Sequence, residues 1–316
     1  MSKTGFAQQS KTVSLVLGSG GARGLAHIGV IRWLEEQGYK IESISGCSIG
    51  ALIGGVYAAG KLDEFESWLR AISRVDVLTL LDISWKRSGL VKGDKIINSL
   101  IELVGDLHIE ELPLTYTAVA TDFLNEKEVW INSGRLFDAI RASISLPLFF
   151  TPFHYQGVDL IDGGVLNPVP IAPTFQDATD LTIAVNLGGA VERCAQVEPV
   201  ADKDNSRVGQ GELMTQLSER IGQFISLFKD SGSEPVRRDW GTYDIANQAF
   251  DAMQSTIARQ KLAAYPADYV VEIARNACGT LEFERAAEMI ELGYAHAQQS
   301  LGPALALQHK VSDPAV

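Results

Sequence analysis

Two strand and helix pairs within the first 60 residues constrain the fold of this chain most strongly. The run Thr12 to Leu17 (TVSLVL) is β-branched and aliphatic and is stopped by glycines, which predicts a buried strand. A helical period follows over Arg23 to Gln37 and ends at Gly38. A second strand candidate, Ile41 to Ser45, precedes a small-residue helix over Ile49 to Ala59. This alternation favours an α/β fold with a mainly parallel central sheet flanked by helices in three layers, with chemistry at the carboxyl ends of the strands.

The rest of the chain divides into parts of different pattern. Residues 13–190 are predicted to form the core, and we expect the sheet to close at the strand candidate Leu181 to Leu187. Residues 191–240 are polar and acidic, which indicates a long excursion whose order or mobility the sequence leaves open. Residues 241–305 are predicted to form C-terminal helices that pack on the core. The segment Trp85 to Val91 interrupts a helical signal and is expected to be either a cover over a site or an ordinary surface loop.

Composition excludes several classes of protein. A formal net charge of -12 is unfavourable for a nucleic-acid binder, which needs basic side chains to neutralise phosphates. Three scattered cysteines without C-x-x-C spacing predict neither a disulfide framework nor a zinc site. The first eleven residues lack the pattern of a secretory signal, and the apolar runs fall short of the roughly 20 residues that a spanning helix needs. We therefore expect a cytoplasmic protein, and any contact with a membrane would be peripheral.

The pentapeptide Gly46-Cys47-Ser48-Ile49-Gly50 lies between a predicted strand and a predicted helix. This G-x-S-x-G pattern is typical of a nucleophile elbow, a sharp turn from which the serine side chain projects. Glycine is needed two residues before and after the serine, because a side chain there would collide with the neighbouring strand or helix. The alternative is a tight turn in which Ser48 only caps the helix.

A second glycine-rich turn, Gly18 to Gly24, also joins a strand to a helix and offers backbone amides to an anion. A dinucleotide-binding G-x-G-x-x-G pattern fails at Arg23, which stands where the third glycine belongs. The Gly-Lys pair of a phosphate-binding P-loop is also missing. An oxyanion hole beside a nucleophile fits best. The Arg23 side chain is expected to bond a neighbouring acid or carbonyl, with a lipid phosphate as the alternative.

The histidines offer no evident general base. None of the five stands in a recognisable catalytic setting, and His27 is predicted to be an interior residue of the helix after the glycine loop. A carboxylate is then the candidate base, and Asp162 precedes Gly163 and Gly164 at the end of a short apolar run. The alternative for Asp162 is a turn aspartate that bonds its own backbone.

Three blocks in this order, GSGGARG, GCSIG and DGGVLNPVP, resemble the blocks of patatin-like phospholipases, and the resemblance runs from about Val13 to Leu187. The stretch ASISLP (Ala142 to Pro147) resembles a further block of that family, whereas Ser19 departs from a glycine that many members carry. The resemblance implies a patatin-like fold and these roles: Ser48 as nucleophile, Asp162 as base, Gly20, Gly21, Ala22 and Arg23 as oxyanion loop, Gly46 and Gly50 as elbow glycines, and Gly163 and Gly164 in the base motif.

The function implied by the resemblance is hydrolysis of acyl esters, with phospholipids or lysophospholipids as substrates and without a metal or other cofactor. Two alternatives belong to other classes. The first is a non-catalytic regulatory or scaffold protein that has kept this fold, because function resides in the site rather than in the fold. The second, which the failed G-x-G-x-x-G pattern disfavours, is a nucleotide-binding protein.

Overall fold

The computed structural model describes residues 11–72, 75–76, 79, 91–191 and 242–311. The chain splits into two compact units, one formed by residues 1–192 together with 252–316 and the other by residues 193–251. Of the second unit only residues 242–251 are described, so the account below concerns the first unit. The expected cover at residues 85–90 and nearly all of the expected excursion at 191–240 lie outside the described residues.

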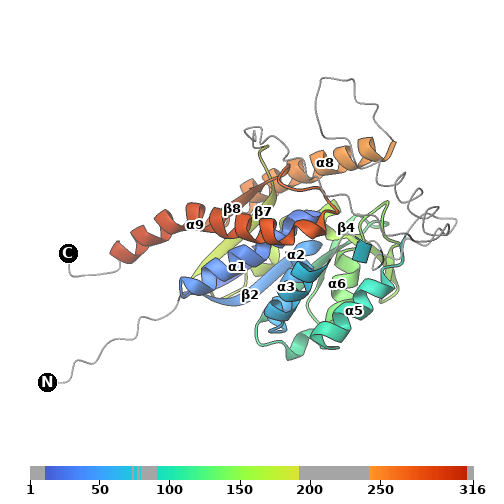
Figure 1. Cartoon of the computed structure of the whole chain (residues 1–316), viewed down its shortest axis with the longest axis horizontal. Helices are drawn as coiled ribbons and strands as arrows, with labels where there is room; N and C mark the ends of the chain where they lie inside the picture. Colours follow the sequence, from blue (N-terminus) through green and yellow to red (C-terminus); the bar gives the residue numbers. More distant parts are fainter. Residues whose placement is uncertain (1–10, 73–74, 77–78, 80–90, 192–241, 312–316) are drawn as a thin grey trace, which may run out of the picture. The chain divides into compact units, whose positions relative to one another are not determined.

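A sheet of eight strands runs through the first unit (Figure 1). The strands follow the order β5-β6-β3-β2-β1-β7-β8, and β4 pairs with β3 off this path. The pairs β1–β2, β2–β3, β1–β7 and β7–β8 are parallel, whereas β3–β4, β3–β6 and β5–β6 are antiparallel. The prediction of a mainly parallel α/β sheet is confirmed. The strands are β1 (Thr12–Leu17), β2 (Lys40–Cys47), β3 (Thr115–Asp122), β4 (Lys127–Ile131), β5 (Phe153–Tyr155), β6 (Val158–Asp162), β7 (Leu181–Gly189) and β8 (Tyr269–Ala274).

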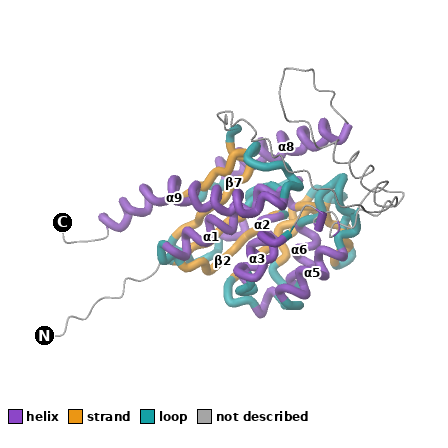
Figure 2. Tube along the Cα trace, in the orientation of Figure 1, coloured by secondary structure: helices purple, strands orange, loops and turns teal. Residues whose placement is uncertain are grey.

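Helices cover both faces of this sheet, and the alternation of side chains along β1 shows how. Leu15 and Leu17 enter the main core, to which α1, α2 and α9 contribute, whereas Val16 enters a smaller cluster with Ala258 of α8. The sheet therefore lies between two helical layers, and Figure 2 shows α1, α2 and α9 on one side of the strands. The α-helices are α1 (Ala26–Glu36), α2 (Ile49–Ala58), α3 (Leu62–Ala71), α5 (Asp94–Val104), α6 (Leu136–Ser143), α8 (Thr242–Ala264) and α9 (Ala286–Val311).

Helix α2 is apolar on all sides and nearly all of its residues are buried, which is typical of a central rather than a surface helix. Short 3-10 turns lie in several of the connections between these elements: η1 (Gly21–Leu25), η2 (Ile109–Glu111), η3 (Gly163–Val165), η4 (Ala172–Thr174) and η5 (Phe283–Arg285). The central position of α2 fixes the residues that precede it, because a helix packed on every side has little freedom to shift.

The C-terminal third corrects one expectation. The sheet does not close at β7, because β8 adds to it in parallel and pairs Ile183 with Tyr269 and Val185 with Val271. The short run YVVEIA of β8 lies in a region whose longer periodic stretches favour helices, so its strand character is decided by pairing with β7. Beyond it, α9 crosses α1 closely: a Cβ on Gly29 would lie 1.9 Å from the carbonyl oxygen of Ile290.

Candidate active site

Ser48 stands at the sharp turn between β2 and α2. Its backbone has φ 56° and ψ -125°, a region that residues other than glycine rarely occupy and that is frequent at functional sites. The side chain is half-buried, so it can be reached from solvent. Its Oγ donates a hydrogen bond of 2.5 Å to Oδ2 of Asp162. The structure therefore brings together the two residues that the sequence singled out, 114 positions apart.

The register on β3 explains how Asp162 reaches the elbow. Val119 of β3 pairs with Cys47 of β2, and the next residue, Ala120, pairs with Asp162 of β6. Both Val119 and Ala120 also pair with β4, which takes the other edge of β3. Strand β6 therefore pairs with the same edge of β3 as β2 does, starting one residue after the last partner of β2. It runs antiparallel to β3, whereas β2 runs parallel to it.

Burial controls the charge of Asp162. The carboxyl group is fully buried, and the loss of hydration raises its pKa from 3.8 to about 6. Hydrogen bonds oppose this rise: Ser48 donates to Oδ2, the amide of Gly164 donates to Oδ1 at 2.7 Å, and the thiol of Cys47 lies 3.9 Å from Oδ1. Because desolvation wins, Asp162 is a stronger base than an exposed aspartate.

Two serines at the end of α6 hold the backbone of both residues. The amide of Ser48 donates to Oγ of Ser143 at 2.9 Å, and that hydroxyl donates to the carbonyl of Val119 at 2.6 Å. The amide of Asp162 donates to the carbonyl of Ser145 at 2.9 Å. The sequence did not single out these serines as functional residues. The signal that could have found them is the ASISLP block, which contains both.

A buried arginine near the end of α6 contacts residues that follow this helix. Arg141 is 4% exposed and donates from Nη1 to Oγ of Ser145 at 2.6 Å and from Nε to the carbonyl of Lys92 at 3.1 Å. Its guanidinium also lies over the ring of Phe150, 5.3 Å from the centroid. These contacts fix the end of α6, from which Ser143 and Ser145 reach the elbow and Asp162.

The glycine loop packs directly against the elbow. A Cβ on Gly50 would lie 2.1 Å from the carbonyl oxygen of Leu17 and 2.8 Å from that of Gly18, so only glycine fits there. Likewise, a Cβ on Gly164 would lie 2.6 Å from Oγ of Ser19, which places the base motif against the same loop. The three blocks of the sequence thus meet at one place. Gly46 and Gly163 are packed just as tightly, because a Cβ on either residue would clash with a neighbouring backbone atom.

The amides of the glycine loop are not all available to an anion. Ala22 donates its amide to the carbonyl of Thr280 at 2.9 Å, and the amide of Arg23 lies within the hydrogen-bonded 3-10 turn η1. In the part of the chain that the structure describes, the amides of Gly20 and Gly21 donate no hydrogen bond. In this conformation Gly20 and Gly21 are therefore the candidate donors, and Ala22 and Arg23 are engaged elsewhere.

Two further residues of this region have structural contacts. His27 is fully buried, its ring bonds the carbonyl of Gly18 over 2.9 Å, and burial lowers its pKa to about 4, so it stays neutral and supports the loop. The Arg23 side chain donates from Nη1 to the carbonyl of Arg275 at 2.8 Å, in agreement with the structural interpretation of this residue.

The described residues form neither a metal site nor a membrane span. Within the described ranges, no group of three or more His, Cys, Asp or Glu side chains is placed to hold a metal ion. Of the cysteines that the structure describes, Cys47 and Cys278 are both free thiols. None of the described helices combines the length and the apolar character that a membrane crossing requires.

Comparison with known proteins assigns the class. Residues 15–175 match the family described as patatin-like phospholipase, which is about half of the chain. Fold and match together define a carboxylic ester hydrolase that acts on lipids. The chain belongs to the patatin-like phospholipase family, and the resemblance drawn from the three sequence blocks is confirmed.

Relatives of two kinds are similar to this chain. An uncharacterized NTE family protein of Mycobacterium tuberculosis is 39% identical, and the match covers 92% of each chain. Lysophospholipase NTE1 of Coccidioides immitis is 28% identical over 92% of this chain but only 18% of its own length. Among solved structures, VipD from Legionella pneumophila is similar with a TM-score of 0.42 and 17% identity, over 93% of this chain and 67% of that one.

Proposed function

We propose that this protein hydrolyses acyl ester bonds of phospholipids or lysophospholipids with Ser48 as nucleophile and Asp162 as the only general base. The observation that carries the proposal is the 2.5 Å hydrogen bond from Ser48 Oγ to the buried Asp162 carboxylate. A serine hydroxyl needs an adjacent base to become a good nucleophile. No histidine is needed in this arrangement, because desolvation already raises the pKa of Asp162 to about 6.

In the proposed mechanism, Ser48 Oγ attacks the ester carbonyl and its proton passes to Asp162. The carbonyl oxygen becomes an oxyanion, which accepts hydrogen bonds from the amides of Gly20 and Gly21. The intermediate collapses, Asp162 returns the proton to the leaving alcohol, and the acyl group stays on Ser48. Water then attacks the acyl-enzyme and gives a proton to Asp162, which passes it to Ser48 Oγ as the bond to the acyl group breaks and the fatty acid leaves.

A small apolar cavity beside the elbow favours an apolar group in the substrate. It has a volume of about 50 Å³ and exposes only apolar surface. Ile49, which follows Ser48, and Leu25, which ends η1, both line it, so it adjoins the elbow and the glycine loop. The other lining residues come mainly from α2, α3 and α5: Leu52, Phe65, Trp68, Leu69, Ile72, Ile96, Leu100 and Phe283. The name of the relative from Coccidioides immitis, lysophospholipase NTE1, favours lysophospholipids among the candidate lipids.

A fluorophosphonate probe tests the nucleophile. We expect the folded protein to form one phosphonyl adduct, located at Ser48 by peptide mass spectrometry, and the Ser48→Ala variant to form none. Ser67→Ala, on the exposed side of α3, is the matched control and should label at the wild-type rate. Labelling at another serine would reject Ser48 as the nucleophile. A folded wild-type protein that hydrolyses no lysophospholipid and takes up no probe would instead support the non-catalytic scaffold.

The acid side of the pH profile tests the base. Asp162 must be ionised to accept the Ser48 proton, and its pKa is about 6. We therefore expect kcat/KM for a short-chain ester to fall as the pH drops, with a midpoint near that value. The measurement is a rate profile between pH 4.5 and 8, with circular dichroism at each pH as the control for folding. A midpoint near pH 4 would contradict a desolvated base.

A further inference from the structure

The segment Arg275–Arg285, termed here the support turn, follows β8 and contacts the glycine loop. The carbonyl of Thr280 accepts the amide of Ala22 at 2.9 Å. The carbonyl of Arg275 accepts Nη1 of Arg23 at 2.8 Å, and Arg23 is 5% exposed. Gly21 lies against the carbonyl of Thr280, since a Cβ on Gly21 would be 2.5 Å from that oxygen. A segment of the C-terminal third thus anchors the loop proposed to bind the oxyanion.

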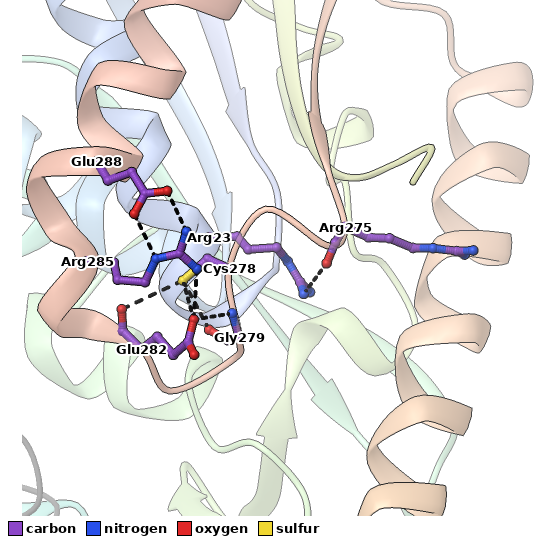
Figure 3. Close-up of polar contacts among 7 residues, drawn as sticks. All are labelled: Arg23, Arg275, Cys278, Gly279, Glu282, Arg285 and Glu288. Carbon is purple, nitrogen blue, oxygen red and sulfur yellow. Dashed lines mark hydrogen bonds and ion pairs between the residues drawn. The ribbon is translucent and has the colours of Figure 1, made fainter. Parts of the chain in front are cut away.

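One carboxylate fixes the shape of the support turn (Figure 3). Oε2 of Glu282 accepts the amide of Gly279 at 2.9 Å and Nη1 of Arg285 at 2.9 Å. The thiol of Cys278 lies 3.6 Å from the same oxygen, and burial raises the pKa of that thiol to about 12, so it remains a donor. These contacts close the turn on both sides of Thr280. The direction of the Thr280 carbonyl therefore depends on Glu282.

We propose that Glu282 is a positioning residue for the oxyanion hole. It holds the support turn so that Thr280 O engages the amide of Ala22, and this contact orients the adjoining amides of Gly20 and Gly21 toward the reacting carbonyl. The proposal rests on the function proposed above. A displacement of about 1 Å in a catalytic group can lower a rate about a hundredfold, so loss of the anchor should act on kcat.

The neighbouring Glu288 offers a matched control. It binds the other side of Arg285, with Oε2 2.8 Å from Nε. Figure 3 shows it on α9, and both of its carboxylate oxygens accept hydrogen bonds from Arg285, the last residue of the support turn. Glu282→Met and Glu288→Met therefore remove the same charge and the same arginine partner. Only Glu282→Met also removes the acceptor for the Gly279 amide.

The experiment measures kcat and KM for p-nitrophenyl acetate, whose acetyl group is too short to depend on the apolar cavity that Phe283 lines. We expect Glu282→Met to lower kcat about tenfold to a hundredfold with KM within about twofold of wild type. Glu288→Met should remain near wild type. Glu282→Gln should restore most of the rate, because its amide oxygen can still accept from Gly279. The rate of fluorophosphonate labelling at Ser48 should fall in parallel with kcat.

Several outcomes would overturn the proposal. A folded Glu282→Met variant with kcat within about twofold of wild type is one, and an equal loss in Glu288→Met is another. Should Glu282→Met fail to fold, Glu282→Ala removes the same acceptor without the bulk of methionine, and a folded Glu282→Ala variant with wild-type kcat rejects the positioning role. A wild-type protein that is itself inert and unlabelled would reject the proposed function, which separates the two failures.

Discussion

The Asp162→Asn variant is expected to lower kcat by at least about a thousandfold, because removal of the base from such a unit disables the nucleophile. Asparagine has nearly the same shape and keeps an oxygen that can accept the amide of Gly164, so the site should stay intact. It cannot accept the Ser48 proton. The measurement is hydrolysis of a lysophospholipid and of a short-chain ester. Asp159→Asn on the same strand is the control, since the side chain of Asp159 is half exposed and bonds the exposed ring of His154. Near-normal turnover in Asp162→Asn would reject Asp162 as the base.

The same variant is expected to be more stable than wild type at neutral pH. Burial raises the pKa of Asp162 from 3.8 to about 6, so the folded state binds this proton more tightly than the unfolded state does. The protonated carboxyl group of Asp162 contributes its full stabilisation of the folded state below about pH 4. This contribution is lost as the pH rises through 6. An uncharged asparagine avoids that loss, which is on the order of 3 kcal/mol. Urea unfolding at pH 4.5 and 7.5 should show a stability gain that grows with pH, and a destabilised variant at pH 7.5 would contradict this expectation.

The Gly50→Ala variant is expected to lose both activity and stability. The added Cβ would lie 2.1 Å from Leu17 O and 2.8 Å from Gly18 O, and both are backbone atoms that cannot move aside. Overpacking of this kind destabilises a core by about 1 to 3 kcal/mol. The clash also forces the elbow away from the glycine loop, so we expect kcat to fall at least about a hundredfold.

An exposed helical residue elsewhere provides the control for this substitution. Ser300 of α9 is exposed to solvent, so Ser300→Ala should be neutral or stabilising. Thermal unfolding and the rate of fluorophosphonate labelling at Ser48 are the two readouts. A Gly50→Ala variant that unfolds at the wild-type temperature and labels at the wild-type rate would show that elbow and loop are not packed as described.

Local signals in the sequence predicted the elements that surround the elbow. The first strand and the helix α2 each carry their own periodicity and stop residues, so short windows of sequence suffice to predict them. Strand β8 was not predicted, because Tyr269–Ala274 is a short apolar run whose partner, β7, lies about 80 residues earlier. Its strand character depends on pairing that no local window contains. Strand β5, of three residues, is likewise defined by its partner β6.

The sequence predicts the parts of the candidate site that consist of side chains, but not the parts that consist of backbone groups. Ser48 and Asp162 stand in motifs, and the structure brings them together. The sequence could not show that the amide of Ala22 is engaged by Thr280, since a carbonyl has no residue signature. For the same reason the carbonyl of Ser145, which holds the amide of Asp162, was visible only as part of a family block.

Strand β3 sets the spacing between Ser48 and Asp162, because it pairs with β2, which ends just before Ser48, and with β6, which ends at Asp162. Cys47 and Asp162 face consecutive residues of β3, so the separation of the proposed nucleophile and the proposed base is set in steps of about 3.3 Å, one residue of strand. A slip of β6 by one residue would turn the carboxylate to the other face of the sheet instead of moving it slightly. The distance between the two groups therefore cannot drift by gradual changes in the hairpin before β6. Mutations that shift β6 along β3 should therefore either keep the Ser48–Asp162 pair intact or abolish it.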